Sequence, residues 1–361
     1  MKKFALVLCM ILALGACKDQ KAKQPQLKPI VKIGATLPLT GNMANIGNAI
    51  KEALLMAKEE IPSDSKYNYE LIIEDDSYDY KRTALNINNF ADIKKADVVL
   101  SLFDGAAGII APVAERNKIN HIGCAWGEKF FEEYKYSFNH FSKPETQAKA
   151  FVELLQEKDI KKFAIVAINY ASMTEMLEYI EKDTKEKNIG ITSVNLVNFG
   201  ERDFRIIIEK IKSQNPDIVM LVMLNPELDI FIKQAMEANL NKPYTAIDLL
   251  PATNYKKLLE GTEFVMSPDG SADFKNKFAQ KTDLPLTSCV ANLYDAVRIT
   301  VDLYEKYNAK PSSEQINNDL YHLRNFDSAI GGQVNVDENG IIDADLIKVK
   351  FEGGKLKTIE E

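Results

Sequence analysis

The chain has 361 residues, of which 46% are hydrophobic and 27% charged, so it can bury a large core and is long enough for about two domains. Its net charge is −7, with 45 Lys and Arg against 52 Asp and Glu. Because acidic and basic residues are interspersed and no basic patch is expected, the composition excludes nucleic acid as a partner.

Residues 1–16 are typical of an export signal. Lys2 and Lys3 precede the apolar run Phe4 to Leu14, which is shorter than the about 20 residues of a membrane-spanning helix. The run ends in Leu14-Gly15-Ala16-Cys17, which resembles a bacterial lipobox, where the chain is cut just before a lipidated cysteine. That resemblance implies a mature protein that is anchored to a membrane through Cys17. A plain secretory signal with an incidental cysteine is the alternative.

Residues 17–29 are rich in Lys, Gln and Pro and contain little to bury, so we expect a flexible tether before a folded part that starts near Ile30. The folded part contains Cys124 and Cys289. In an exported protein two such cysteines either form a disulfide or remain buried thiols, and their spacing does not decide between these.

From Ile30 onward, short strands alternate with helical patterns, which is typical of parallel sheets with crossover helices. In the first series strands are expected at 31–38, 70–75, 97–103 and 119–124, with helices at 46–61, 82–91 and 106–117. In the second series strands are expected at 163–168, 191–198, 217–223 and 244–248, with helices at 146–156, 173–186, 204–213 and 227–238. The unit therefore occurs twice, which predicts two α/β lobes.

Asp104 is the first polar candidate for a site. Phe103 ends an expected strand, and Asp104-Gly105 opens a helix whose first N–H groups lack partners within the helix. In open α/β sheets, ligands bind outside the carboxyl ends of the strands. Asp104 is therefore either an N-cap, a carboxylate of the ligand site, or both.

No metal site, cofactor or catalytic motif is expected. Asp75, Asp76 and Asp79 lack the central Gly and final Glu of a calcium-binding loop, and the histidines lie in separate elements without ligand spacing. The sequence has neither a Gly-x-Ser-x-Gly elbow nor a phosphate-binding glycine loop, so we do not expect an enzyme.

Several segments, in this order, resemble type I periplasmic solute-binding proteins of the branched-chain amino acid family. They are an opening strand and helix, an acidic turn before a helix, a block with Asp-Phe at a helix start, a Tyr-Asp-Ala helix and a terminal hairpin. The segments are 33–57 (IGATLPLTGNMANIGNAIKEALLMA), 74–90 (EDDSYDYKRTALNINNF), 200–240, 292–299 (NLYDAVRI) and 334–343 (VNVDENGIID). The likeness extends from Ile30 to the C-terminus.

The resemblance implies an α/β fold of two doubly wound parallel-sheet lobes that close over a ligand and are joined by three hinge crossings. The crossings are expected near 141–144, 266–269 and 329–333. Lobe one is then 30–142 with 268–328, and lobe two is 143–267 with 329–361.

The resemblance also implies a ligand site, carried over by position from the amino-acid-binding members. It falls on Asp104, Gly105, Ala106, Ala125, Trp126, Gly127, Tyr170, Ser172 and Asp248. In those members, hydroxyls after the third and fourth strands hold the amino acid, and this chain lacks both of them. Asp104, which follows the third strand, would repel a ligand carboxylate. We therefore expect a small polar solute that is not a plain branched-chain amino acid.

The implied function is that of a lipid-anchored substrate-binding subunit of an ABC importer. The protein would be a periplasmic monomer, attached to the membrane by Cys17, with the transporter permease as its protein partner. The alternative is an outer-membrane lipoprotein with the same fold and anchor that serves as a scaffold and activates a peptidoglycan synthase.

Overall fold

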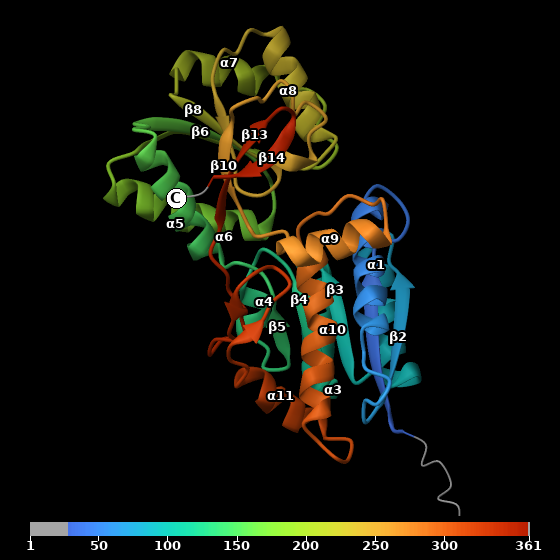
Figure 1. The fold of residues 1–361 in the computed structure, drawn as a ribbon. Coiled ribbons are helices and arrows are strands. Elements are labelled where there is room, and N and C mark those ends of the chain that lie inside the picture. The colour runs from blue at the N-terminus through green and yellow to red at the C-terminus, as the bar shows by residue number, and fades with distance from the viewer. Residues whose placement is uncertain (1–27, 360–361) are drawn as a thin grey trace, which may run out of the picture.

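The computed structural model describes residues 28–359, which form two α/β lobes stacked end to end (Figure 1). The expected signal peptide, Cys17 and nearly all of the tether lie outside these residues. Within residues 28–359, none of the helices has the length and apolar character needed to span a membrane.

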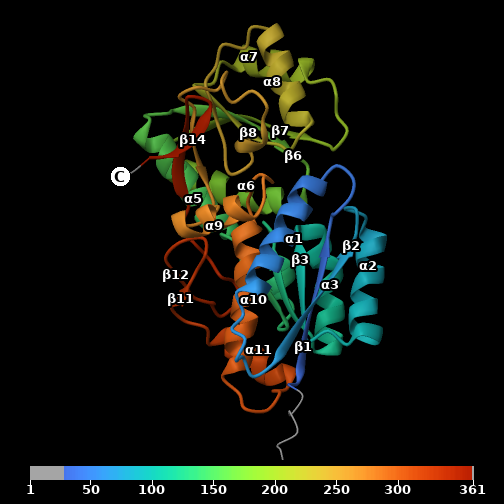
Figure 2. The same cartoon turned by 45° about the vertical axis from the view of Figure 1, so that its right-hand side comes forward.

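Lobe one is built on a parallel sheet with strand order β2-β1-β3-β4-β5. Every residue of β3 and β4 is buried, since helices cover both faces of the sheet (Figure 2). The strands are β1 (Ile30–Leu37), β2 (Asn68–Asp75), β3 (Val98–Leu102), β4 (Asn120–Cys124) and β5 (Ser137–Asn139).

The helices of lobe one pack in two layers. One face of the sheet is covered by α1 (Ala44–Glu59), α9 (Ala272–Lys281), α10 (Val290–Glu305) and α11 (Ser313–Tyr321). The other face is covered by α2 (Tyr80–Asn88), a π-helical turn (Asn89–Lys94) and α3 (Asp104–Asn117). The short helix α4 (Lys129–Glu132) packs its Phe131 against α3.

Lobe two is built on a parallel sheet with strand order β7-β6-β8-β9. Its strands are β6 (Lys162–Ile168), β7 (Gly190–Val197), β8 (Ile218–Val222) and β9 (Tyr244–Thr245). Helices α5 (Pro144–Glu157) and α6 (Ala171–Glu186) pack on one face, and α7 (Arg205–Gln214) and α8 (Glu227–Glu237) on the other. The two parallel sheets with helices on both faces confirm the expected fold class.

A small antiparallel sheet completes lobe two, and a short hairpin lies against lobe one. The sheet has the order β10-β13-β14, formed by β10 (Glu263–Met266), β13 (Ile347–Glu352) and β14 (Lys355–Thr358). The hairpin pairs β11 (Phe326–Asp327) with β12 (Gln333–Val334). A turn of 3-10 helix at Leu250–Ala252 follows β9.

The third crossing lies later than the sequence predicts. Ala329, Ile330 and Val334 belong to the core of lobe one, and Ile342 donates its N–H to the Asn139 carbonyl at 2.7 Å. The assignment of residues 329–342 to lobe two, and of a crossing to 329–333, is therefore wrong in this structure. These apolar residues pack beside α10, and the chain enters lobe two only after Ile342.

The first and third crossings run side by side. The Asp343 carboxylate accepts from the Lys143 N–H at 2.8 Å and from the Thr146 hydroxyl at 2.7 Å. The Ser142 hydroxyl donates to the Ala344 carbonyl at 2.7 Å. These contacts tie the two crossings into one connection between the lobes.

Cys124 and Cys289 form a disulfide, which settles the choice that the sequence left open. It joins the end of β4 to the residue before α10, and the Cα atoms are 5.7 Å apart. The bridge closes a chain loop with a sequence separation of 165 residues, and that loop includes most of lobe two. In the chain-entropy account, a loop of this length restricts the unfolded chain strongly.

We predict that replacing both cysteines with serine lowers the free energy of unfolding by about 2–4 kcal/mol, because the unfolded chain regains the freedom of the long loop. Urea denaturation of the oxidised wild type and of the double variant measures this. Dithiothreitol should shift the wild type and leave the variant unchanged. Equal stability of the two proteins in the oxidised state would contradict the prediction.

Candidate functional site

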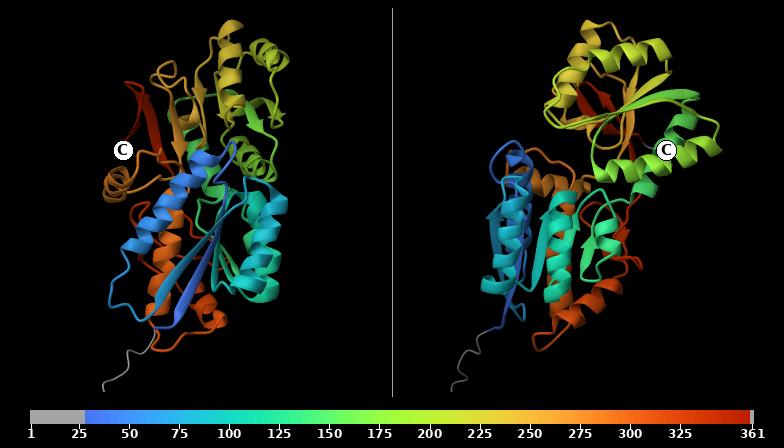
Figure 3. Two further views of the ribbon diagram at one scale, coloured as in Figure 1. Left: turned by 90° about the vertical axis from the view of Figure 1, so that its right-hand side faces the viewer. Right: turned by 180° about the vertical axis from the view of Figure 1, so that it is seen from behind.

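The carboxyl ends of β3 and β4 face α6 of lobe two, and this is where the predicted site lies (Figure 3). Parallel strands end at one edge of a sheet, so the loops that follow β3 and β4 are neighbours. The loop after β6 starts α6, which brings lobe two to the same place.

Asp104 joins the two loops of lobe one. It is the first residue of α3, and the N-cap position before it is held by Phe103 with φ of +68°. No side chain caps the helix, so the N-cap interpretation of Asp104 is wrong. Its Oδ1 instead accepts the Gly127 N–H at 3.0 Å, which links the start of α3 to the loop after β4.

The second oxygen of Asp104 is buried without a partner. The residue is 3% exposed, and Oδ2 makes no hydrogen bond. Burial raises the pKa of Asp104, while the Ser172 hydroxyl and the Gly127 and Trp126 amides oppose the shift. The Ser172 hydroxyl thus lies close enough to the Asp104 carboxylate to stabilise its charged form, although Oδ2 has no hydrogen-bond partner.

Gly105 lies under the ring of Tyr80. A Cβ atom at Gly105 would come within 2.3 Å of Cε1, Cζ and the hydroxyl oxygen of Tyr80, so a larger residue there would displace the Tyr80 side chain. The Tyr80 hydroxyl shares a hydrogen bond of 2.6 Å with the Tyr170 hydroxyl, which comes from lobe two. Tyr78 lies 3.4 Å from the same Tyr170 oxygen. These tyrosines close the cleft above the start of α3, whereas Ala106 is buried in the core.

The loop after β4 contributes Ala125, Trp126 and Gly127. Asn139 holds both backbone groups of Ala125, accepting from its N–H at 3.0 Å and donating to its carbonyl at 2.9 Å. Trp126 packs edge-on against Phe141 with ring centroids 6.4 Å apart. Gly127 is in contact with lobe two, since a Cβ there would lie 3.3 Å from Ser172 Cβ.

Two glutamates accompany these residues across the interface. A Cβ at Gly127 would lie 3.5 Å from Oε2 of Glu175, one turn along α6 from Ser172. Burial raises the pKa of Glu128 to about 7, and Glu132 and Glu175 add to the shift. The Tyr179 hydroxyl of lobe two donates to Glu128 Oε1 at 3.4 Å.

Asp248 follows β9 in lobe two and contacts the segment expected to form the second crossing. Its carboxylate accepts from the Ser267 N–H at 2.7 Å and from the Ser267 hydroxyl at 3.3 Å. Burial raises the pKa of Asp248 to about 6, and these bonds together with the Trp126 side chain oppose the shift. Asp248 thus supports the crossing from lobe two while it faces Trp126 of lobe one.

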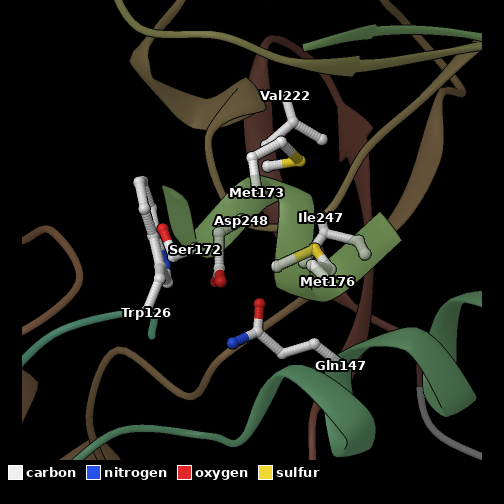
Figure 4. Close-up of a pocket in the computed structure, with 8 residues that line it drawn as sticks. All are labelled: Trp126, Gln147, Ser172, Met173, Met176, Val222, Ile247 and Asp248. Atoms are coloured by element: carbon white, nitrogen blue, oxygen red, sulfur yellow. The ribbon is translucent and has the colours of Figure 1, made fainter. Parts of the chain in front are cut away.

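A small space lies between Trp126 and side chains of lobe two (Figure 4). Apolar side chains line one side of it, while Gln147 and Asp248 point toward one another from opposite sides. The space is too small to hold a water molecule. The lining residues are Trp126, Gln147, Ser172, Met173, Met176, Val222, Ile247 and Asp248.

The structure thus brings Asp104, Gly105, Trp126 and Gly127 of lobe one close to Tyr170, Ser172 and Asp248 of lobe two. Ala106 and Ala125, by contrast, are buried in the packing of lobe one. Sequence reasoning missed Tyr80, Glu175 and Glu128. The sequence does hint at Glu175, because it lies three residues after the predicted site residue Ser172 and therefore on the same face of α6. Among residues 28–359, no group of His, Cys, Asp and Glu side chains is placed to hold a metal ion.

The comparisons with known proteins agree with the two-lobe α/β fold. A family model described as periplasmic binding protein matches residues 30–355. The leucine-binding protein LivK of Thermotoga maritima superposes with a TM-score of 0.81 at 22% identity, covering 91% of this chain and 98% of that chain. A solute-binding protein of an ABC transporter from Rhodopseudomonas palustris, solved with benzoate, gives 0.79 at 18%, covering 91% and 95%.

A further solved structure is the branched-chain amino acid-binding protein LivJ of Streptococcus pneumoniae in complex with isoleucine. It superposes with a TM-score of 0.79 at 17% identity, covering 91% of this chain and 99% of that chain. The family is one of binding proteins and not of enzymes. This chain belongs to the periplasmic binding proteins, with the type I fold of the branched-chain amino acid-binding members.

Proposed function

We propose that this protein captures a small polar solute between its lobes and presents it to an ABC importer. The observation that carries the proposal is the convergence of residues from both lobes at one interface, around the Asp104 carboxylate. Proteins of the same fold bind leucine, isoleucine and benzoate, which supports a small-molecule ligand. The proposed contacts are Asp104, Gly105, Ala106, Ala125, Trp126, Gly127, Tyr170, Ser172 and Asp248.

The interface in this conformation is closed. The Tyr80–Tyr170 hydrogen bond and the Tyr179–Glu128 hydrogen bond span the lobes, and the space beside Trp126 is too small for a water molecule. A solute can therefore enter only when the lobes separate, and we propose that they rotate about the crossings. The paired first and third crossings would move together in that rotation.

The test is a thermal-shift screen of small metabolites, followed by small-angle X-ray scattering with each stabilising compound. A ligand at 100 times its dissociation constant should stabilise the protein by about 2.7 kcal/mol. We expect at least one ligand, with one binding site per chain and a smaller radius of gyration when it is bound. A screen without any ligand, together with recovery of a peptidoglycan synthase in pull-downs, would favour the scaffold alternative instead.

The charge of Asp104 gives a second test. We predict that Asp104→Asn stabilises the protein more at pH 8 than at pH 4, because Asn keeps an acceptor for the Gly127 N–H without the buried charge. Burial raises the pKa of Asp104 above its ordinary value of 3.8. Below 3.8 the wild-type carboxyl is protonated whether folded or unfolded, so the cost of the charge is absent. That cost grows as the pH rises through the raised pKa.

Melting temperatures of the wild type and Asp104→Asn across this pH range measure the difference. Asp64→Asn is the control, because Asp64 is exposed on a turn. A difference between Asp104→Asn and the wild type that does not change with pH would show that the carboxylate carries no burial cost.

We also propose that Cys17 anchors the protein to a membrane, on the basis of the Leu14-Gly15-Ala16-Cys17 sequence. Native protein should fractionate with membranes, and Cys17→Ser should remain soluble and unlipidated. Cell fractionation and mass spectrometry of the mature N-terminus measure both. An unmodified N-terminus in the native protein would rule out the anchor.

A further inference from the structure

Carboxylates from both lobes gather around Gly127. Asp104 Oδ1 is 3.0 Å from the Gly127 nitrogen, and Glu175 Oε2 would be 3.5 Å from a Cβ at the same residue. The two carboxylates therefore approach Gly127 from opposite lobes. Each is buried, and the negative charge of Asp104 helps to raise the pKa of Glu175. Glu128 and Glu132 add further negative charge from lobe one.

Positive charge near this group is scarce. Lys129 favours the charged form of Glu175, and Lys143 favours that of Glu128. The Lys143 ammonium, however, already pairs with Asp337 at 2.5 Å. More carboxylates than cations therefore face the interface, and like charges in a buried site repel strongly.

Asp104 Oδ2 marks where a donor is missing. This oxygen is buried and makes no hydrogen bond, although a buried acceptor is normally satisfied. A positively charged N–H donor would meet both needs of the site, since it would pair with the oxygen and offset the excess negative charge. The side chain beside Asp104 from lobe two is the short Ser172.

Aromatic rings stand beside the same carboxylate. Tyr80 covers the start of α3 at Gly105, and Tyr170 meets it from lobe two. Tyr78 packs edge-on against Phe103 with centroids 5.6 Å apart, and the Asp104 charge acts on it. Aromatic faces next to a carboxylate favour an organic cation, while the residues described here offer no cluster suited to a metal ion.

We propose that the ligand carries a primary ammonium or guanidinium group that binds between Asp104 of lobe one and Glu175 of lobe two, with Tyr80 and Tyr170 against its carbon skeleton. This inference rests on the proposed capture of a solute between the lobes and specifies the chemical class of that solute. Asp104 and Glu175 then determine specificity, because each pairs with the cation from a different lobe. Binding offsets the repulsion between the two carboxylates, so the cation itself favours closure.

The test uses pairs of probes that differ in charge and little in shape. Diaminobutane is compared with butanediol, and butylguanidine with butylurea, while leucine and benzoate represent solutes with a carboxylate. Calorimetry measures each against the wild type, Asp104→Asn, Glu175→Gln and the control Glu178→Gln. Glu178 lies on the same helix α6 but is exposed, so it reports the loss of a carboxylate away from the interface.

We expect at least one cation to bind the wild type and Glu178→Gln equally, and its neutral partner, leucine and benzoate to bind weakly. Asp104→Asn and Glu175→Gln should each weaken cation binding roughly thirtyfold or more, as expected when one partner of a buried charge pair is removed. Circular dichroism and melting temperature establish that the variants are folded, which isosteric substitutions favour.

The outcomes separate this inference from the proposed function. Binding of a neutral or anionic solute without binding of either cation overturns the cation site and leaves solute capture intact. Cation binding that survives both Asp104→Asn and Glu175→Gln also overturns the assignment of these residues. Failure of both cations here and of every compound in the metabolite screen overturns the inference and the proposed function together.

Discussion

The hydrogen bond from the Gly127 N–H to Asp104 Oδ1 is the contact on which the interface between the lobes depends. It holds the start of α3 against the loop after β4 and fixes the carboxylate with its second oxygen toward lobe two. Burying a carboxylate with an unsatisfied oxygen is costly, and the raised pKa of Asp104 expresses that cost. Between the lobes, a hydrogen-bond donor from a ligand would satisfy this oxygen and offset the cost of burying it.

The connection between the lobes determines which motions can open this interface. Asp343 accepts from Lys143 and Thr146, and Ser142 donates to Ala344. These hydrogen bonds hold the first and third crossings together. The second crossing is held separately, by Asp248 at Ser267. The paired first and third crossings and the second crossing are two separate connections between the lobes. Such connections allow the lobes to rotate about the line that joins them. Such a rotation would break the Tyr80–Tyr170 hydrogen bond, which is exposed.

Much of the fold could be predicted from the sequence because apolar runs and helical spacing are local properties. Except for β5, which was not expected, the strands of both parallel sheets lie near their expected positions. The loops after β3 and β4 are neighbours because parallel strands of one sheet end at the same edge. The third crossing was misplaced because apolar residues such as Ile330 and Val334 do not encode which core receives them. The disulfide stayed undecided, and Tyr80 and Glu175 were missed, because their contacts depend on how distant elements pack.

The family resemblance places both Asp104 and Asp248 in the predicted ligand site. Their hydrogen-bond partners, however, give them different roles. Asp248 accepts from the Ser267 N–H and hydroxyl in the adjoining crossing, and the Trp126 side chain also favours its charged form. Asp104 accepts a hydrogen bond at Oδ1 from the Gly127 N–H, and its buried Oδ2 has no partner, although the Ser172 hydroxyl of lobe two lies near the carboxylate. A carboxylate that is satisfied by its own neighbours needs nothing from a ligand. The one that is half satisfied, with a second carboxylate opposite, gains most from a cation, and for that reason Asp104 and not Asp248 governs what the cleft can bind.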